Sequence, residues 1–201
     1  MEHLKKQILS NTALLLIPAL FVVTGMYFYS IVGAYYLRAV DPEYLYLFSG
    51  MTMARFKFEL GHIDNPGTPL QIIIAIIIRI SNLSKNDSDL VQTVINNPEP
   101  YLQATFYILL IINCTILFIL GKIASNITGL FGGFFIQIIP FSSIHYMATV
   151  MRVRPETLQL FSLCLLIILI LYHVQAGFKY GKTIKPGLFA LVIALDRKSV
   201  V

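Results

Sequence analysis

The chain has 201 residues, of which 57% are hydrophobic and only 12% charged, with a formal net charge of +5 and a mean hydropathy of +0.75. A soluble domain carries about a quarter of its residues as charges, so this composition argues for an integral membrane protein and against a water-facing globular fold. The basic residues are scattered rather than gathered in one patch, which argues against a nucleic-acid partner.

The first apolar segment covers about residues 12–37 and exceeds the roughly 20 residues needed to cross a hydrocarbon core. Lys5 and Lys6 precede it, so the positive-inside rule predicts a cytoplasmic N-terminus. No clear small-residue cleavage site follows the segment, which argues against a removed signal peptide.

Residues 38–100 form a polar stretch that we expect as a large loop on the non-cytoplasmic side. One apolar run interrupts it at residues 70–80, and at roughly 1.5 Å of rise per residue this run is too short to span. We interpret the run as a helix that lies in the interface or re-enters the membrane. A short, tilted spanning helix is the alternative.

Four later apolar segments predict further spanning helices. If the run at residues 70–80 does not cross, the short Lys-bearing loops all fall on the cytoplasmic side, in agreement with the positive-inside rule. The expected fold is therefore all-α, a polytopic transmembrane helical bundle with interfacial helices in its outer loop. The four segments cover about residues 101–120, 127–144, 157–172 and, cut short, 186–195.

The last six residues interrupt the final apolar segment with three charged side chains. The letters DRKSVV at residues 196–201 also resemble translated sequencing-adapter sequence. We therefore expect residues 196–201 to be a non-native tail, attached to the N-terminal part of a longer transmembrane protein.

Two carboxylates, Asp41 and Glu43, follow the first span directly. At this spacing they could converge on a cation or on a substrate hydroxyl, and burial near a membrane raises a carboxylate pKa toward that of a useful base. The alternative is an ordinary helix start, because Asp is a good cap and Pro42 suits a first helical turn.

The segment from His62 to Pro69 is denser in polar chemistry. His62 and Asp64 can serve as ligands or as an acid–base pair. Asn65 opens a tight turn, Asn-Pro-Gly, that aims these groups back toward the membrane face. An incidental polar turn is the alternative interpretation.

A third cluster lies at the outer entrance of the span at residues 157–172. Arg152 and Arg154 could grip a phosphate, since a guanidinium matches that geometry in a fork. Glu156 follows Pro155 and could be a helix-dipole partner or an ion-pair partner of Arg154.

The order and sidedness of these motifs resemble the GT-C superfamily of glycosyltransferases, specifically its polytopic family 39-like members that transfer mannose or aminoarabinose. Such proteins have a cytoplasmic N-terminus, one span and a large outer loop that holds an acidic motif, interfacial helices and a proline motif. The matching features here are DPEY at residues 41–44, NPGTPL at residues 65–70, Arg79 and Glu156.

The resemblance implies an inverting transfer from a polyprenyl-phosphate sugar to a lipid, glycan or protein acceptor on the outer side. It implies that Asp41 is the general base and that Arg154 faces the lipid phosphate, where it stabilises the leaving group. The residues implied to bind substrate are Glu43, Tyr44, His62, Asp64, Asn65, Arg154 and Glu156, and those implied to hold a divalent metal are Asp41, Glu43, His62 and Asp64.

The chain departs from the family at one point. The basic residue that normally precedes the proline motif is replaced by Asp64 and Asn65, so phosphate contact falls to Arg55, Lys57 or Arg154.

Two other functions stay open, a transporter or lipid flippase and a non-catalytic membrane scaffold. A transporter places ionisable groups near the midplane of its spans, whereas the span interiors here offer little beyond Asn113 and Gln137. We expect a multi-pass protein in contact with membrane lipids, in a bacterial inner (plasma) membrane.

Overall fold

The computed structural model describes residues 9–32, 43–57, 68–142, 144, 147–148 and 151–175. Every element within these ranges is a helix, which confirms the predicted all-α class. The predicted segment at residues 186–195 and the predicted tail at 196–201 lie outside the described residues. The elements in chain order are α2 (Leu16–Val32), α3 (Glu43–Ala54), α4 (Thr68–Ser81), α5 (Asp87–Asn96), α6 (Glu99–Ile138), the 3-10 helix η2 (Ile139–Ser142) and α8 (Glu156–Gln175).

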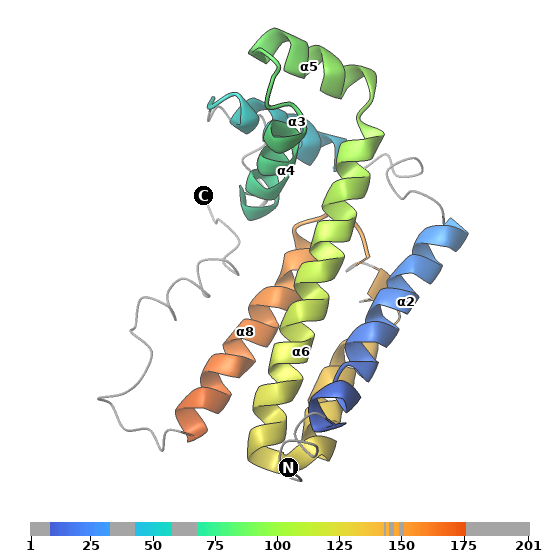
Figure 1. The fold of residues 1–201 in the computed structure, drawn as a ribbon, viewed down its shortest axis with the longest axis vertical. Helices are drawn as coiled ribbons and strands as arrows, with labels where there is room; N and C mark the ends of the chain where they lie inside the picture. The colour runs from blue at the N-terminus through green and yellow to red at the C-terminus, as the bar shows by residue number, and fades with distance from the viewer. Residues whose placement is uncertain are drawn as a thin grey trace.

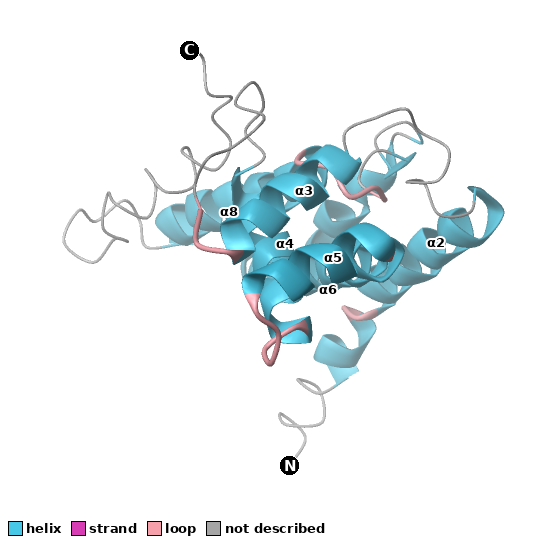
Figure 2. Ribbon diagram, turned by 90° about the horizontal axis from the view of Figure 1, so that it is seen from above, coloured by secondary structure: helices cyan, strands magenta, loops and turns pink. Residues whose placement is uncertain are grey.

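A bundle of long apolar helices makes up the larger part of the described chain. α6 runs through its middle, with α2 and α8 packed along opposite sides (Figures 1 and 2). Two helical stretches, Leu9–Ile31 and Glu99–Ser142, are long and apolar enough to cross a membrane, and Glu156–Tyr172 is a shorter apolar helix. These stretches contain the predicted spans at residues 101–120 and 157–172, and most of those at 12–37 and 127–144.

The long helix α6 reverses direction at Gly129, so the two spans predicted there form a hairpin. Gly129 has φ 82°, a left-handed conformation that glycine adopts without strain. Beyond it, Gln137 Nε2 donates to the carbonyl oxygen of Leu117 at 3.0 Å and to that of Leu14 at 3.1 Å. In a straight helix Leu117 and Gln137 would lie about 30 Å apart. One buried amide therefore ties both arms of the hairpin to the first helix.

Close approach of the two arms depends on small residues. A Cβ added at Gly133 would lie 2.7 Å from the carbonyl oxygen of Gly121 on the opposite arm. Because that atom belongs to the backbone, it cannot move aside as a side-chain end would. Small residues at such crossings let helices pack closely in membranes.

Replacement of Gly133 by leucine should destabilise the hairpin by about 3 kcal/mol, the upper end of the usual cost of overpacking. Denaturant unfolding of the purified protein in detergent would measure the loss. The matched control is Phe131→Leu, since Phe131 lies on the same arm but is 81% exposed. Equal stability of the two variants would show that the arms do not pack through Gly133.

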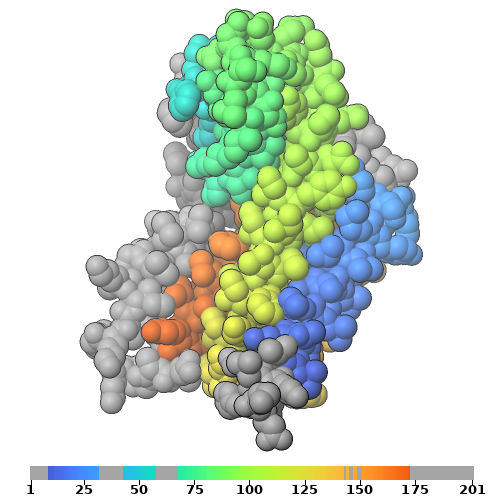
Figure 3. Space-filling view, viewed as in Figure 1, coloured from blue at the N-terminus to red at the C-terminus, as the bar shows by residue number. Residues whose placement is uncertain are grey.

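α3, α4 and α5 form a layer across one end of the bundle, which we call the head layer (Figures 1 and 3). α3 and α4 pack along each other through buried Leu47, Leu70 and Ile74. Gly50 permits this contact, because a Cβ there would lie 2.6 Å from Ile74.

α4 contains the apolar run at residues 70–80. Its 14 residues rise about 21 Å, less than the roughly 30 Å of a hydrocarbon core. It also packs against α3 and α6, while Ile72, Ile76 and Ile80 form an exposed apolar stripe. Length and packing thus favour an interfacial helix over a spanning one.

Charged side chains of the described residues gather at the head-layer end. Within residues 9–32, 100–142 and 157–172 the only Asp, Glu, Lys or Arg is Lys122. Lys122 lies in α6, seven residues before the Gly129 reversal. The reversal of α6 lies at the opposite end of the bundle from the head layer (Figure 1). The near absence of charge along these apolar helices is typical of helices that cross a membrane.

Candidate functional site

The ion pair between Glu43 and Arg154 joins two segments that are far apart in sequence. Arg154 Nε lies 3.8 Å from Glu43 Oε1, and the side chains are 19% and 1% exposed. The distance exceeds that of a hydrogen bond, so the contact is an ion pair. A charge as deeply buried as that of Glu43 needs a counter-charge, and Arg154 provides one.

Arg154 is held by the turn that leads into α8. The backbone N–H of Thr157 donates to the carbonyl oxygen of Arg154 at 3.0 Å, and the Thr157 hydroxyl donates to that of Arg152. From α6, Asn113 Nδ2 donates to the carbonyl oxygen of Thr157 at 3.1 Å. With Met151 buried as well, the turn is fixed to the bundle on both sides of Arg154.

Glu43 is held by the packing of α3. It is the first residue of that helix, where the helix dipole favours a negative charge. The next turn buries Tyr46 and Leu47. The helix start therefore aims the Glu43 side chain into the protein rather than into solvent.

Tyr44 follows Glu43 in the sequence, and Glu156 lies two residues after Arg154. Burial raises the pKa of the Tyr44 phenol above its ordinary value, and the negative charges of Glu99 and Glu43 raise it further. The phenol therefore stays protonated at neutral pH and remains a hydrogen-bond donor. Glu156 begins α8, and its Oε2 atom is buried with no hydrogen-bond partner among the described residues.

The structure brings together part of the predicted substrate-binding set. Glu43 and Arg154 are in contact, and Tyr44 and Glu156 are their neighbours in sequence. The predicted base Asp41 and the predicted ligands His62, Asp64 and Asn65 lie outside the described residues.

The predicted metal site stays a prediction. Of its four ligands only Glu43 is described, and its carboxylate pairs with a guanidinium. The described ranges contain no group of three or more His, Cys, Asp or Glu side chains placed to hold a metal ion.

Sequence reasoning missed the role of Asn113. An asparagine inside an apolar span is costly unless its side chain is hydrogen-bonded, so its presence in the sequence already indicated a structural or functional contact. The structure shows that Asn113, 1% exposed, anchors the start of α8 just beside Arg154. It therefore helps to hold the turn that carries Arg154.

Two apolar hollows lie in the bundle, and none of the described site residues lines them. One of about 430 Å³ lies between the start of the first helix and the second arm of α6, and one of about 490 Å³ between the α6 hairpin and α8. The second is lined by Ala124, Thr128, Phe131, Gly132, Phe135, Ile136, Ile139 and Leu171.

Comparisons with known proteins add no relative. No family model matches the chain, and neither a curated protein nor a solved structure gives a significant match. Functional inference therefore rests on the residues and their arrangement.

Proposed function

We propose that this protein is a membrane glycosyltransferase that moves a sugar from a polyprenyl-phosphate donor to an acceptor hydroxyl on the non-cytoplasmic side. The ion pair between Glu43 and Arg154 supports this proposal most strongly. It joins the acidic start of the outer segment to the arginine turn before α8. A shared catalytic pocket requires these two segments to be in contact.

In this proposal the polar groups divide the work. Asp41 takes the proton of the acceptor hydroxyl, whose oxygen attacks the anomeric carbon with inversion while the polyprenyl phosphate leaves. Arg154 stabilises the negative charge that grows on the leaving phosphate. Glu43 orients the Arg154 guanidinium, and the residues around His62 and Asp64 hold the substrate or a divalent metal.

The proposed topology is multi-pass, with the N-terminus and Lys122 in the cytoplasm and the head layer outside. Lys122 is the single Asp, Glu, Lys or Arg within residues 9–32, 100–142 and 157–172, which supports helices that cross the membrane, and Lys5 and Lys6 before the first of them support a cytoplasmic N-terminus. We place the protein in a bacterial inner membrane.

A transporter or flippase is the second candidate, and the bundle interior gives it less support. Two polar residues are predicted inside the spans, Asn113 and Gln137. Their side-chain amide nitrogens donate hydrogen bonds to backbone carbonyl oxygens of neighbouring helical segments. They brace the bundle in the manner of interhelical polar contacts in membranes. A non-catalytic scaffold is the third candidate.

Reconstitution separates these functions. The protein in liposomes, supplied with a radiolabelled polyprenyl-phosphate sugar and candidate acceptors, should transfer label to an acceptor in the outer compartment. Movement of the intact labelled lipid across the bilayer without transfer would replace the proposal with a flippase. Absence of both would leave a scaffold.

A further inference from the structure

The turn that ends α3 has an unusual residue two positions after Ala54. The backbone N–H of Phe56 donates to the carbonyl oxygen of Met53 at 2.8 Å, and that of Lys57 donates to Thr52 at 3.2 Å. This bond pair is a Schellman motif, whose reversal residue is usually glycine because its φ is positive. Phe56 occupies that position with φ 59°, a backbone conformation that residues with bulky side chains rarely adopt.

Burial does not offset this strain, because Phe56 is 75% exposed. Its ring instead lies beneath Arg79 of α4, whose Cζ atom is 5.8 Å from the ring centroid, within cation–π range. A strained residue that gains little from packing points to a function.

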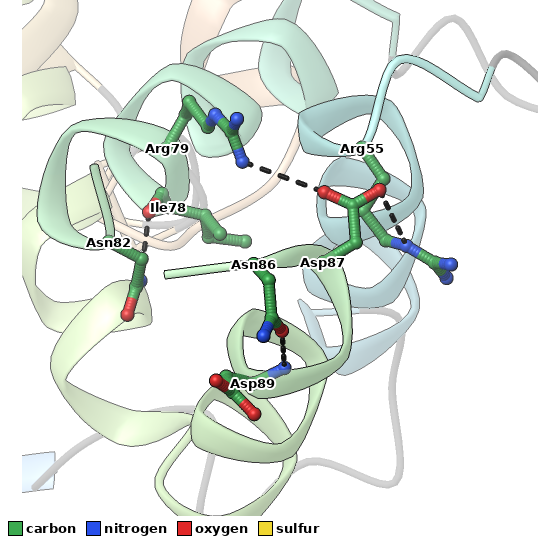
Figure 4. Close-up of polar contacts among 7 residues, drawn as sticks. All are labelled: Arg55, Ile78, Arg79, Asn82, Asn86, Asp87 and Asp89. Atoms are coloured by element: carbon green, nitrogen blue, oxygen red, sulfur yellow. Dashed lines mark hydrogen bonds and ion pairs between the residues drawn. The ribbon is translucent and has the colours of Figure 1, made fainter. Parts of the chain in front are cut away.

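Two arginines flank Asp87 (Figure 4), and one of them is Arg79, which lies over the Phe56 ring. Arg55 Nε lies 3.8 Å and Arg79 Nη1 3.7 Å from the carboxylate, beyond hydrogen-bond distance. Neither nitrogen has a hydrogen-bond acceptor among the described residues. One carboxylate thus faces two guanidiniums, and Lys57 adds a further positive charge.

This group, Arg55, Phe56, Lys57 and Arg79, is named here the Phe56 corner. An exposed aromatic face suits the apolar C–H face of a sugar ring, and guanidinium forks suit phosphate or carboxylate oxygens. We propose that the Phe56 corner binds an anionic saccharide, a sugar ring that bears a phosphate or a carboxylate. On the basis of the proposed transfer reaction, this saccharide is part of the acceptor.

The position of the corner favours an acceptor over the surrounding bilayer. The 12 residues of α3 rise about 18 Å, which separates the corner from the Glu43–Arg154 pair at the other end of the helix. Asp87 begins α5, which forms the edge of the head layer farthest from the bundle (Figure 1). The corner therefore lies at the far edge of the head layer, away from the bundle helices.

Binding to the whole protein in neutral-lipid nanodiscs tests the proposal without any transfer reaction. Isothermal titration with glucose 6-phosphate should show binding at least ten-fold tighter than with glucose or with inorganic phosphate. Phe56→Gly should keep or raise Tm, because it relieves the positive-φ strain, yet weaken glucose 6-phosphate binding at least ten-fold. Arg79→Gln should weaken it similarly, whereas the control Lys122→Gln, at the other end of the bundle, should bind as the wild type does.

Three results would overturn the inference. The first is that glucose 6-phosphate binds no more tightly than glucose, and the second is that Phe56→Gly binds it as tightly as the wild type does. The third is that vesicles of anionic phospholipid displace the sugar phosphate, which would make the corner a lipid-surface contact. Because the titration needs no donor, a protein that binds but does not transfer would refute the proposed function alone.

Discussion

Replacement of Arg154 by methionine should lower the free energy of unfolding by about 3–5 kcal/mol, the usual cost of removing one partner of a buried ion pair. Glu43, 1% exposed, would keep its carboxylate in the interior without the guanidinium opposite it. Denaturant unfolding in detergent would measure the change. Arg154→Lys, which keeps a cation at the position, should recover part of the loss.

A double-mutant cycle identifies the cause. The double variant Glu43→Gln/Arg154→Met should lose less free energy of unfolding than the sum of the losses in the two single variants, because residues in contact are coupled. Lys122→Met removes an exposed cation elsewhere and should change stability by no more than about 0.5 kcal/mol. Additive losses in the cycle would mean that Glu43 and Arg154 do not interact.

Replacement of Asp41 by asparagine should reduce the transfer rate about 10²- to 10⁴-fold, the usual contribution of a general base. Asparagine has nearly the same shape, so expression and the unfolding midpoint should stay as in the wild type. Turnover of a labelled polyprenyl-phosphate sugar would measure the rate. The matched control is Asp89→Asn, an exposed carboxylate in the first turn of α5.

Retained turnover in Asp41→Asn would remove Asp41 as the base. A parallel loss in Asp89→Asn would instead attribute the effect to a general change of charge in the outer segment.

The spans could be predicted because they depend on local composition. The apolar segments at residues 101–120 and 127–144 were separable from the sequence, since a polar stretch with Lys122 lies between them. The structure adds how they meet, through a reversal at Gly129 and the reach of Gln137 to Leu14 and Leu117. No local pattern encodes that reach, because its acceptors lie far away along the chain.

Glu43 and Arg154 were both named from the sequence as candidate substrate-binding residues, but their contact with each other was not predicted. Glu43 was expected to face substrate or metal, and Arg154 a phosphate or Glu156. Their contact depends on how the bundle positions α3 relative to the turn before α8. That arrangement is set by contacts between segments far apart in the sequence. Arg55 and Lys57 were named from the sequence as candidate phosphate contacts, but Phe56 was not, because a positive φ at a non-glycine residue leaves no mark in composition.

Sidedness is the claim on which the proposed function depends, and cysteine labelling tests it most directly. In a background without Cys114 and Cys164, single cysteines would replace Asp89 in the head layer, Arg152 in the turn before α8, and Lys122. A membrane-impermeant maleimide should label the first two in intact cells and the third only after permeabilisation. Labelling of positions 89 and 152 from opposite sides would contradict a shared outer pocket.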